Sequence, residues 1–118
     1  MNLDTYLSTL KSAPSSINFE DTISTIDEHY VFTATLFNNA DLSNPAGQNN
    51  GSCKIFAFAQ LHDLTEEQTL HCFGGYYRKD VLQNPDANDH QNIRNFIKTG
   101  WHGIVFDSPA LNLKSASK

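Results

Sequence analysis

The segment from Cys53 to Leu61 constrains the fold more than any other, because it is apolar on every side of a helix. Lys54 and Gln60 are the only polar side chains within it. A helix that is apolar all round is normally buried. The sequence therefore predicts a central helix over residues 53–62, capped by Ser52, with the other elements packed around it.

Apolar residues at helical spacing and helix-start signals predict further helices around this one. The predicted stretches are residues 3–12, residues 18–29 behind Asn18, a helix opened by the Thr65 capping box, and residues 89–99 behind Asp89. Gly100 is placed to end the last of them. The pair Gly74-Gly75 lies inside the third and costs up to about 2 kcal/mol in a helix interior. Either another backbone approaches closely there or the helix breaks.

Extended structure is predicted in two places. Residues 31–36 are β-branched and aromatic, and residues 103–106 are apolar, so a strand pair between them is expected. The Asn-rich stretch 38–51 is predicted to be a loop. Either the loop has a function, or its amide side chains only form hydrogen bonds with the loop's own backbone. The fold class is therefore α+β and predominantly helical: four to five helices around residues 53–62, with a small two-stranded β element.

A length of 118 residues is enough for one domain. Pro14 lies in a stretch that breaks the helical pattern at 13–16, which divides an N-terminal segment, 1–16, from a globular domain over 17–113. The segment is rich in Ser and Thr and is predicted to be a short helix or an export signal. Residues 114–118 are predicted to be a disordered tail.

Charge and hydropathy exclude some classes of protein. The net charge is −5, and no element carries the basic face that nucleic-acid binding requires. No apolar run reaches the roughly 20 residues of a membrane span. With no secretory signal peptide at its start, the chain is expected in the bacterial cytoplasm unless a dedicated machine such as a type III system exports it. Cys53 and Cys72 are expected to be thiols there.

Several long runs resemble a known family. They are NPAGQNNGSCKIFAFA at 44–59, TLHCFGGYYRKDVL at 69–82, DHQNIRNF at 89–96 and TGWHG at 99–103. The chain is similar over residues 17–113 to the HopJ type III effector proteins, with Asn39-Ala40 where that pattern has Asn-Gly. The resemblance implies an effector-family protein with a role in virulence, but the family name describes an origin rather than a mechanism.

One hypothesis for the chemistry is a cysteine hydrolase. Cys53 lies at a predicted helix start, where N–H groups favour a thiolate. The segment resembles the Gln…Gly-Ser-Cys…Ala-Phe stretch of papain-like proteases, which implies Cys53 as nucleophile and Gln48 in an oxyanion hole, with His90 and Asn92 following in that family's order. The alternative is that Cys53 is a small buried apolar residue. His62 lies on the opposite face of the same helix, which excludes it as a partner.

The sequence predicts neither a metal nor another cofactor. The groups that could bind zinc lack the close pairs typical of such sites. They are His62, Asp63, His71, Cys72, His90 and His102.

A second hypothesis is a binding site without chemistry, for a small polar or anionic ligand or a host protein. Arg78 or Arg94 would be the charged contact. The predicted binding residues are Asn44, Asn49, Ser52, Tyr77, Arg78, Asp89, Arg94, Asn95 and Trp101. The alternative is that these side chains only cap helices, form ion pairs or hydrogen-bond to the backbone. An enzyme needs Cys53 partly exposed and His90 within reach, whereas a binding domain tolerates a buried Cys53.

Overall fold

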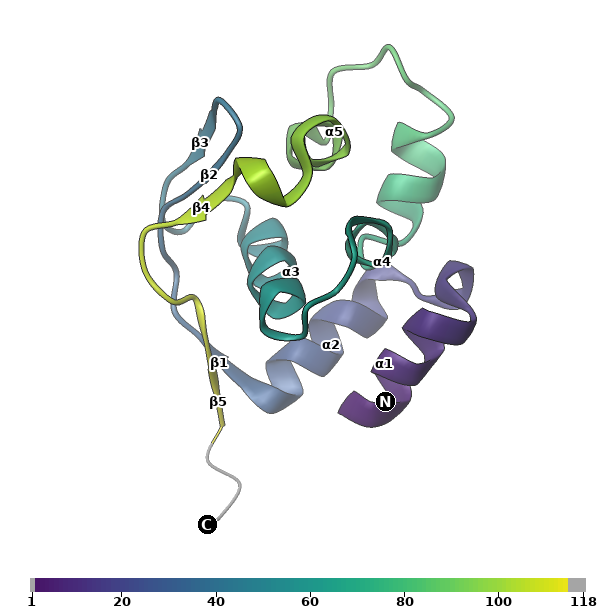
Figure 1. Ribbon diagram of the computed structural model, residues 1–118, viewed down its shortest axis with the longest axis vertical. Coiled ribbons are helices and arrows are strands. Elements are labelled where there is room, and N and C mark those ends of the chain that lie inside the picture. Colours follow the sequence, from purple (N-terminus) through teal and green to yellow (C-terminus); the bar gives the residue numbers. More distant parts are fainter. Residues whose placement is uncertain (1, 115–118) are drawn as a thin grey trace.

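The protein is an α+β domain in which helices predominate, as the sequence predicts (Figure 1). The computed structural model describes residues 2–114. Its α-helices are α1 (Leu3–Ser12), α2 (Phe19–His29), α3 (Asn50–Leu61), α4 (Glu66–His71) and α5 (Gln91–Thr99). Shorter helical turns are η1 (Pro14–Ser16), the π-helical η2 (Tyr76–Val81) and η3 (Gly100–Gly103). The strands are β1 (Tyr30–Phe32), β2 (Phe37–Asn39), β3 (Leu42–Asn44), β4 (Ile104–Phe106) and β5 (Leu111–Leu113).

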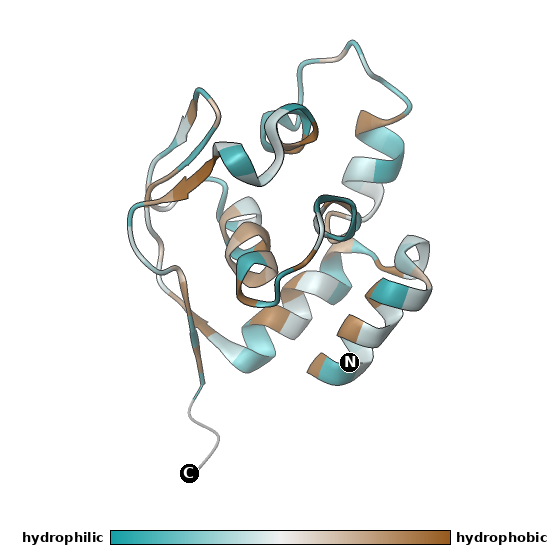
Figure 2. Ribbon diagram, viewed as in Figure 1, coloured by the Kyte–Doolittle hydropathy of each residue, from teal (hydrophilic) through white to brown (hydrophobic). Residues whose placement is uncertain are grey.

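Helix α3 forms the centre of the core, which confirms the main prediction from the sequence. Ile55, Phe56 and Phe58 have no exposed surface. The Phe56 ring contacts aromatic rings from four other parts of the chain, those of Phe37, Phe73, Phe96 and Trp101. In Figure 2 the apolar residues of α3 lie in the middle of the surrounding elements.

The strands pair differently from the prediction. β1 is antiparallel to β5, with Tyr30 opposite Leu113. β2 lies between β3 and β4, with Phe37 opposite Phe106. The expected pairing of 31–36 with 103–106 is wrong, because the chain leaves the first ladder after Phe32 and the partner of β4 comes from the Asn-rich stretch predicted to be a loop.

Helix α1 belongs to the same core as the rest of the domain. Tyr6 and Leu10 are fully buried, and the Tyr6 hydroxyl lies 2.6 Å from Thr22 Oγ1 of α2. Residues 13–16 therefore make a turn within one core rather than a joint between a tail and a domain. Of the predicted disordered tail, residues 115–118 lie outside the described part of the chain.

The chain turns sharply at Gly74, which has a φ of +62°. An added Cβ there would lie 2.5 Å from the backbone nitrogen of Phe19. Both predicted alternatives are therefore true: α4 ends at His71, and the start of α2 packs directly against the glycine. The predicted caps Asn18 and Thr65 each form a capping box. Ile97 of α5 is 46 % exposed.

The turn between β2 and β3 places Ala40 at a φ of +58°, a conformation that costs an L-residue with a Cβ about 1–2 kcal/mol. We expect Ala40→Gly to raise the free energy of unfolding by about 0.5–1 kcal/mol, because glycine adopts this conformation without steric strain. Urea denaturation measures the change. An unchanged or lower midpoint would show that the alanine is not strained.

Candidate functional site

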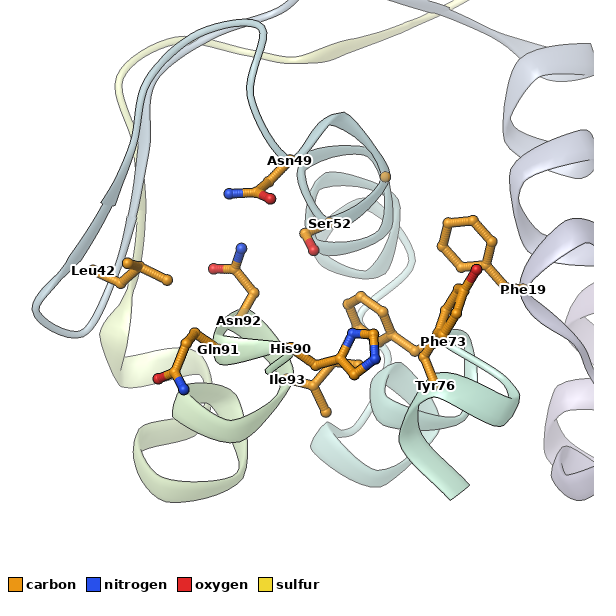
Figure 3. Close-up of a pocket in the computed structure, with 11 residues that line it drawn as sticks. Phe19, Leu42, Asn49, Ser52, Phe73, Tyr76, His90, Gln91, Asn92 and Ile93 are labelled. Carbon is orange, nitrogen blue, oxygen red and sulfur yellow. The ribbon is translucent and has the colours of Figure 1, made fainter. Parts of the chain in front are cut away.

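A pocket of about 400 Å³ opens where the starts of α2, α3 and α5 meet η2 (Figure 3). Its lining side chains fall into two groups. The apolar group is Phe19, Leu42, Phe73, Tyr76 and Ile93. The polar group is Asn49, Gly51, Ser52, His90, Gln91 and Asn92. The lining thus includes amides, a hydroxyl and an imidazole but no carboxylate.

Two helices begin at this pocket without a side-chain cap. The residues before α3 and α5 are Asn49 and His90, at φ of 54° and 51°, and neither makes a capping hydrogen bond. The predicted caps Ser52 and Asp89 do not serve as caps. Both first turns also lack acidic residues, whereas α1, α2 and α4 each have a cap and at least one acid there. The free N–H groups at these two helix starts give this end of the pocket a partial positive charge.

The opposite wall of the pocket is aromatic. The Phe19 and Tyr76 rings lie 5.1 Å apart between centroids, edge to face. The His90 ring lies 5.2 Å from Tyr76, tilted by 37°. Figure 3 shows these three rings on one side of the pocket and the Asn49 and Asn92 amides on the other.

A network of buried amides fixes the polar end. Asn92 Nδ2 donates to Asn44 Oδ1 at 2.9 Å, and Asn92 Oδ1 accepts from Asn39 and Asn44 at 3.0 and 3.2 Å. Asn49 Nδ2 donates to the same Asn44 oxygen at 2.7 Å. The network therefore joins the hairpin β2–β3 to the starts of α3 and α5. Asn44 positions the pocket without lining it.

His90 is oriented by an acid from η2. Its Nε2 lies 3.0 Å from Asp80 Oδ2. Asp89 Oδ2 is farther, at 3.9 Å, and Asp89 Oδ1 accepts a hydrogen bond from Arg94 at 2.7 Å. That hydrogen bond lowers the pKa of the Asp89 carboxyl, with a smaller contribution from His90.

The predicted cysteine site is not assembled. Cys53 is only 1 % exposed, and its Sγ faces the backbone oxygen of Thr35 at 4.0 Å, away from the pocket. Burial raises the pKa of the Cys53 thiol above its ordinary value. Gln48 is exposed on the loop and does not line the pocket. The exposed thiol that the hydrolase hypothesis requires is therefore missing, although His90 and Asn92 do lie in the pocket.

The two arginines predicted as charged contacts brace the fold instead. Arg78 donates to the backbone oxygens of Ile17 and Pro14. Arg94 is 8 % exposed and donates to Asp89 and to the backbone oxygen of Asn84. Neither lines the pocket.

Other predicted binding residues are also occupied elsewhere. Tyr77 packs edge-on against His71, Asn95 donates to the backbone oxygen of Asn39, and Trp101 Nε1 donates to that of Leu64. The residues that the sequence-based prediction missed include Phe19, which lines the pocket, and Asp80, which contacts His90. Gly74 was the available signal, because it marks the close approach that brings Phe19 beside η2.

Within residues 2–114 no three His, Cys, Asp or Glu side chains gather in a way that could hold a metal ion. No helix in that range is long and apolar enough to cross a membrane.

The fold and the pocket define a small α+β domain with an aromatic and amide-lined pocket at converging helix starts. Residues 3–111 match the HopJ type III effector protein family, so the chain belongs to that family. It is similar to a solved crystal structure of the protein VPA0580, described there as of unknown function, with 53 % identity and a TM-score of 0.95 over 97 % of this chain and 95 % of that one. No curated protein matches.

Proposed function

We propose that this domain binds a small anionic ligand with a planar apolar part in the pocket between α3, α5 and η2. The observation that carries the proposal is the convergence of two uncapped helix starts on one pocket that also has an aromatic wall. Free N–H groups at a helix start bind carboxylate or phosphate oxygens, and the helix dipole favours their charge.

The aromatic wall supports the second part of the ligand. Tyr76 is 41 % exposed, so its ring is accessible to a ligand in the pocket. A flat ring placed against Phe19 and Tyr76 would gain the edge or stacking contacts that aromatic pairs favour. A volume of about 400 Å³ suits a molecule of one or two rings.

Titration with phenyl phosphate, followed by NMR on the labelled full chain, tests the proposal. We expect the amide signals of Gly51, Ser52 and Asn92 to shift, and neutral benzyl alcohol to bind at least about tenfold more weakly, because it lacks the charge that the helix starts favour. Equal binding of the two compounds would overturn the anionic part of the proposal. Shifts confined to other regions would overturn the site.

A charge placed at the helix start provides the matched variant. Ser52→Asp should weaken phenyl phosphate binding by about tenfold or more, since a carboxylate in the first turn of α3 would offset the positive charge of the helix start and repel the anion. Ser8→Asp adds the same charge to an exposed position of α1, which does not line the pocket, and should leave binding within about twofold.

The family match also supports the proposal that the chain is exported by a type III system into host cells. Expression in a strain with and without that system, followed by detection in the medium, tests this. Equal amounts outside both strains would contradict it.

A further inference from the structure

The pocket holds a histidine whose free ring nitrogen is set up to accept a proton. A carboxylate can only accept a hydrogen bond, so the 3.0 Å contact with Asp80 places the His90 proton on Nε2. In the neutral imidazole Nδ1 then carries the lone pair. In Figure 3 a ring nitrogen of His90 faces the part of the pocket that contains Ser52. The Asp89 carboxylate, 3.9 Å from Nε2, accepts a hydrogen bond from Arg94 instead. Asp80 therefore remains the hydrogen-bond partner of His90 Nε2.

Ser52 has the surroundings of a nucleophile. It lies in the first turn of α3, lines the pocket, and is partly exposed, unlike its neighbour Cys53. Its hydroxyl makes no hydrogen bond to any of residues 2–114, and the N–H groups of Gly51 and Ser52 likewise have no partner there. Such N–H groups stabilise the negative charge that develops on a carbonyl oxygen under attack.

We propose that Ser52, His90 and Asp80 form a hydrolytic site for small carboxylic esters that carry an aromatic group. Ser52 is the nucleophile, His90 the general base, and Asp80 a positioning residue that holds the imidazole in the required tautomer. The assignment rests on the pocket of the proposed function and deepens it, since the carboxylate released from such an ester is itself a planar anion.

The reaction proceeds in two balanced steps. Ser52 Oγ attacks the ester carbonyl carbon while its proton moves to His90 Nδ1, and the oxyanion lies against the N–H groups at the start of α3. The ester C–O bond then breaks, and the leaving alcohol takes the proton from Nδ1. Water next attacks the acyl-serine, again losing its proton to Nδ1. The carboxylic acid leaves, and Ser52 regains its proton.

Ser52 and His90 do not share a hydrogen bond in the structure. Catalytic pairs commonly close to bonding distance only around the substrate. The two side chains line the same pocket from different helices, and the two starts are tied together through the Asn49, Asn44 and Asn92 amides. In the proposed site the ester carbonyl binds between these two side chains.

Two measurements on the full chain test the assignment. A fluorophosphonate probe carrying an aryl group should modify Ser52, as located by peptide mass spectrometry. Hydrolysis of p-nitrophenyl benzoate should fall by at least about 100-fold in Ser52→Ala. Ser43→Ala, an exposed serine of β3 outside the pocket, is the matched control and should keep the full rate. The proposal is overturned if Ser52→Ala hydrolyses the ester as fast as the unaltered chain does and the probe leaves Ser52 of the unaltered chain unmodified.

Asp80→Asn distinguishes positioning from a structural role. The amide can offer Nε2 a donor in place of an acceptor, so the tautomer changes and hydrolysis should fall at least about tenfold with an altered pH–rate profile. Phenyl phosphate binding should be retained in both variants, because neither substitution removes the backbone N–H groups at the two helix starts. If the unaltered chain binds phenyl phosphate but neither hydrolyses the ester nor reacts with the probe, the catalytic site alone is overturned. If the unaltered chain does not bind phenyl phosphate, the proposed function is overturned.

Discussion

Gly74→Ala is expected to lower the free energy of unfolding by about 3 kcal/mol or more, because a left-handed residue with a Cβ is strained and the new methyl group would overlap a backbone. The added Cβ would lie 2.5 Å from Phe19 N and 2.9 Å from Asn18 Cα. Neither is the flexible end of a side chain, so the start of α2 must move as a whole. Thermal and urea denaturation measure the loss.

The adjacent glycine provides the control. Gly75 has helical angles, φ −63° and ψ −26°, and an added Cβ would meet nothing within 4 Å. Gly75→Ala should therefore stabilise the protein by about 0.5–1 kcal/mol. Equal effects of the two substitutions would contradict the close approach of α2 to this turn. Because Phe19 lines the pocket, Gly74→Ala should also weaken ligand binding, and Gly75→Ala should not.

Asn92→Leu is expected to lower the free energy of unfolding by about 3 kcal/mol, since it leaves several buried amide groups without partners. Asn92 is 6 % exposed and accepts from both Asn39 and Asn44. Leucine has a similar size, so the loss measures unsatisfied hydrogen bonds more than an altered volume. Urea denaturation determines it.

Asn95→Leu is the matched control on the same helix. Asn95 is less buried and donates one side-chain hydrogen bond, to the backbone oxygen of Asn39. Its replacement should cost about 1 kcal/mol. If Asn92→Leu were as mild, the amide network would not be what joins the hairpin to the two helices.

Local signals predicted the helices well. Capping by Asn18 and Thr65, the helical spacing of Tyr6 and Leu10, and the all-apolar face of α3 each act within a few residues, so the sequence reveals them. The strands were harder because each spans three residues, and the partner of such a short strand depends on contacts far along the chain.

The site was predicted only in part for the same reason. Asn49 and Ser52 were predicted as binding residues, His90 and Asn92 as members of the cysteine site, and all four line the pocket. The left-handed conformations of Asn49 and His90 are imposed by their tertiary surroundings, so Ser52 and Asp89 were mistaken for caps. Arg78 and Arg94 were assigned to a ligand because the tertiary fold determines which backbone oxygens lie beside them. The partners of Arg78 are 61 and 64 residues away in the sequence.

The strand order also determines when this protein can fold during synthesis. β4 and β5 come from the last part of the described chain, yet one completes the sheet begun by β2 and the other pairs with β1. A nascent chain that has not yet emerged as far as β4 therefore has α1, α2 and α3 but lacks one strand of each sheet. The two sheets are therefore completed only after β4 and β5 have emerged, and we expect the part of the chain made before them to be exposed to chaperones and proteases until then.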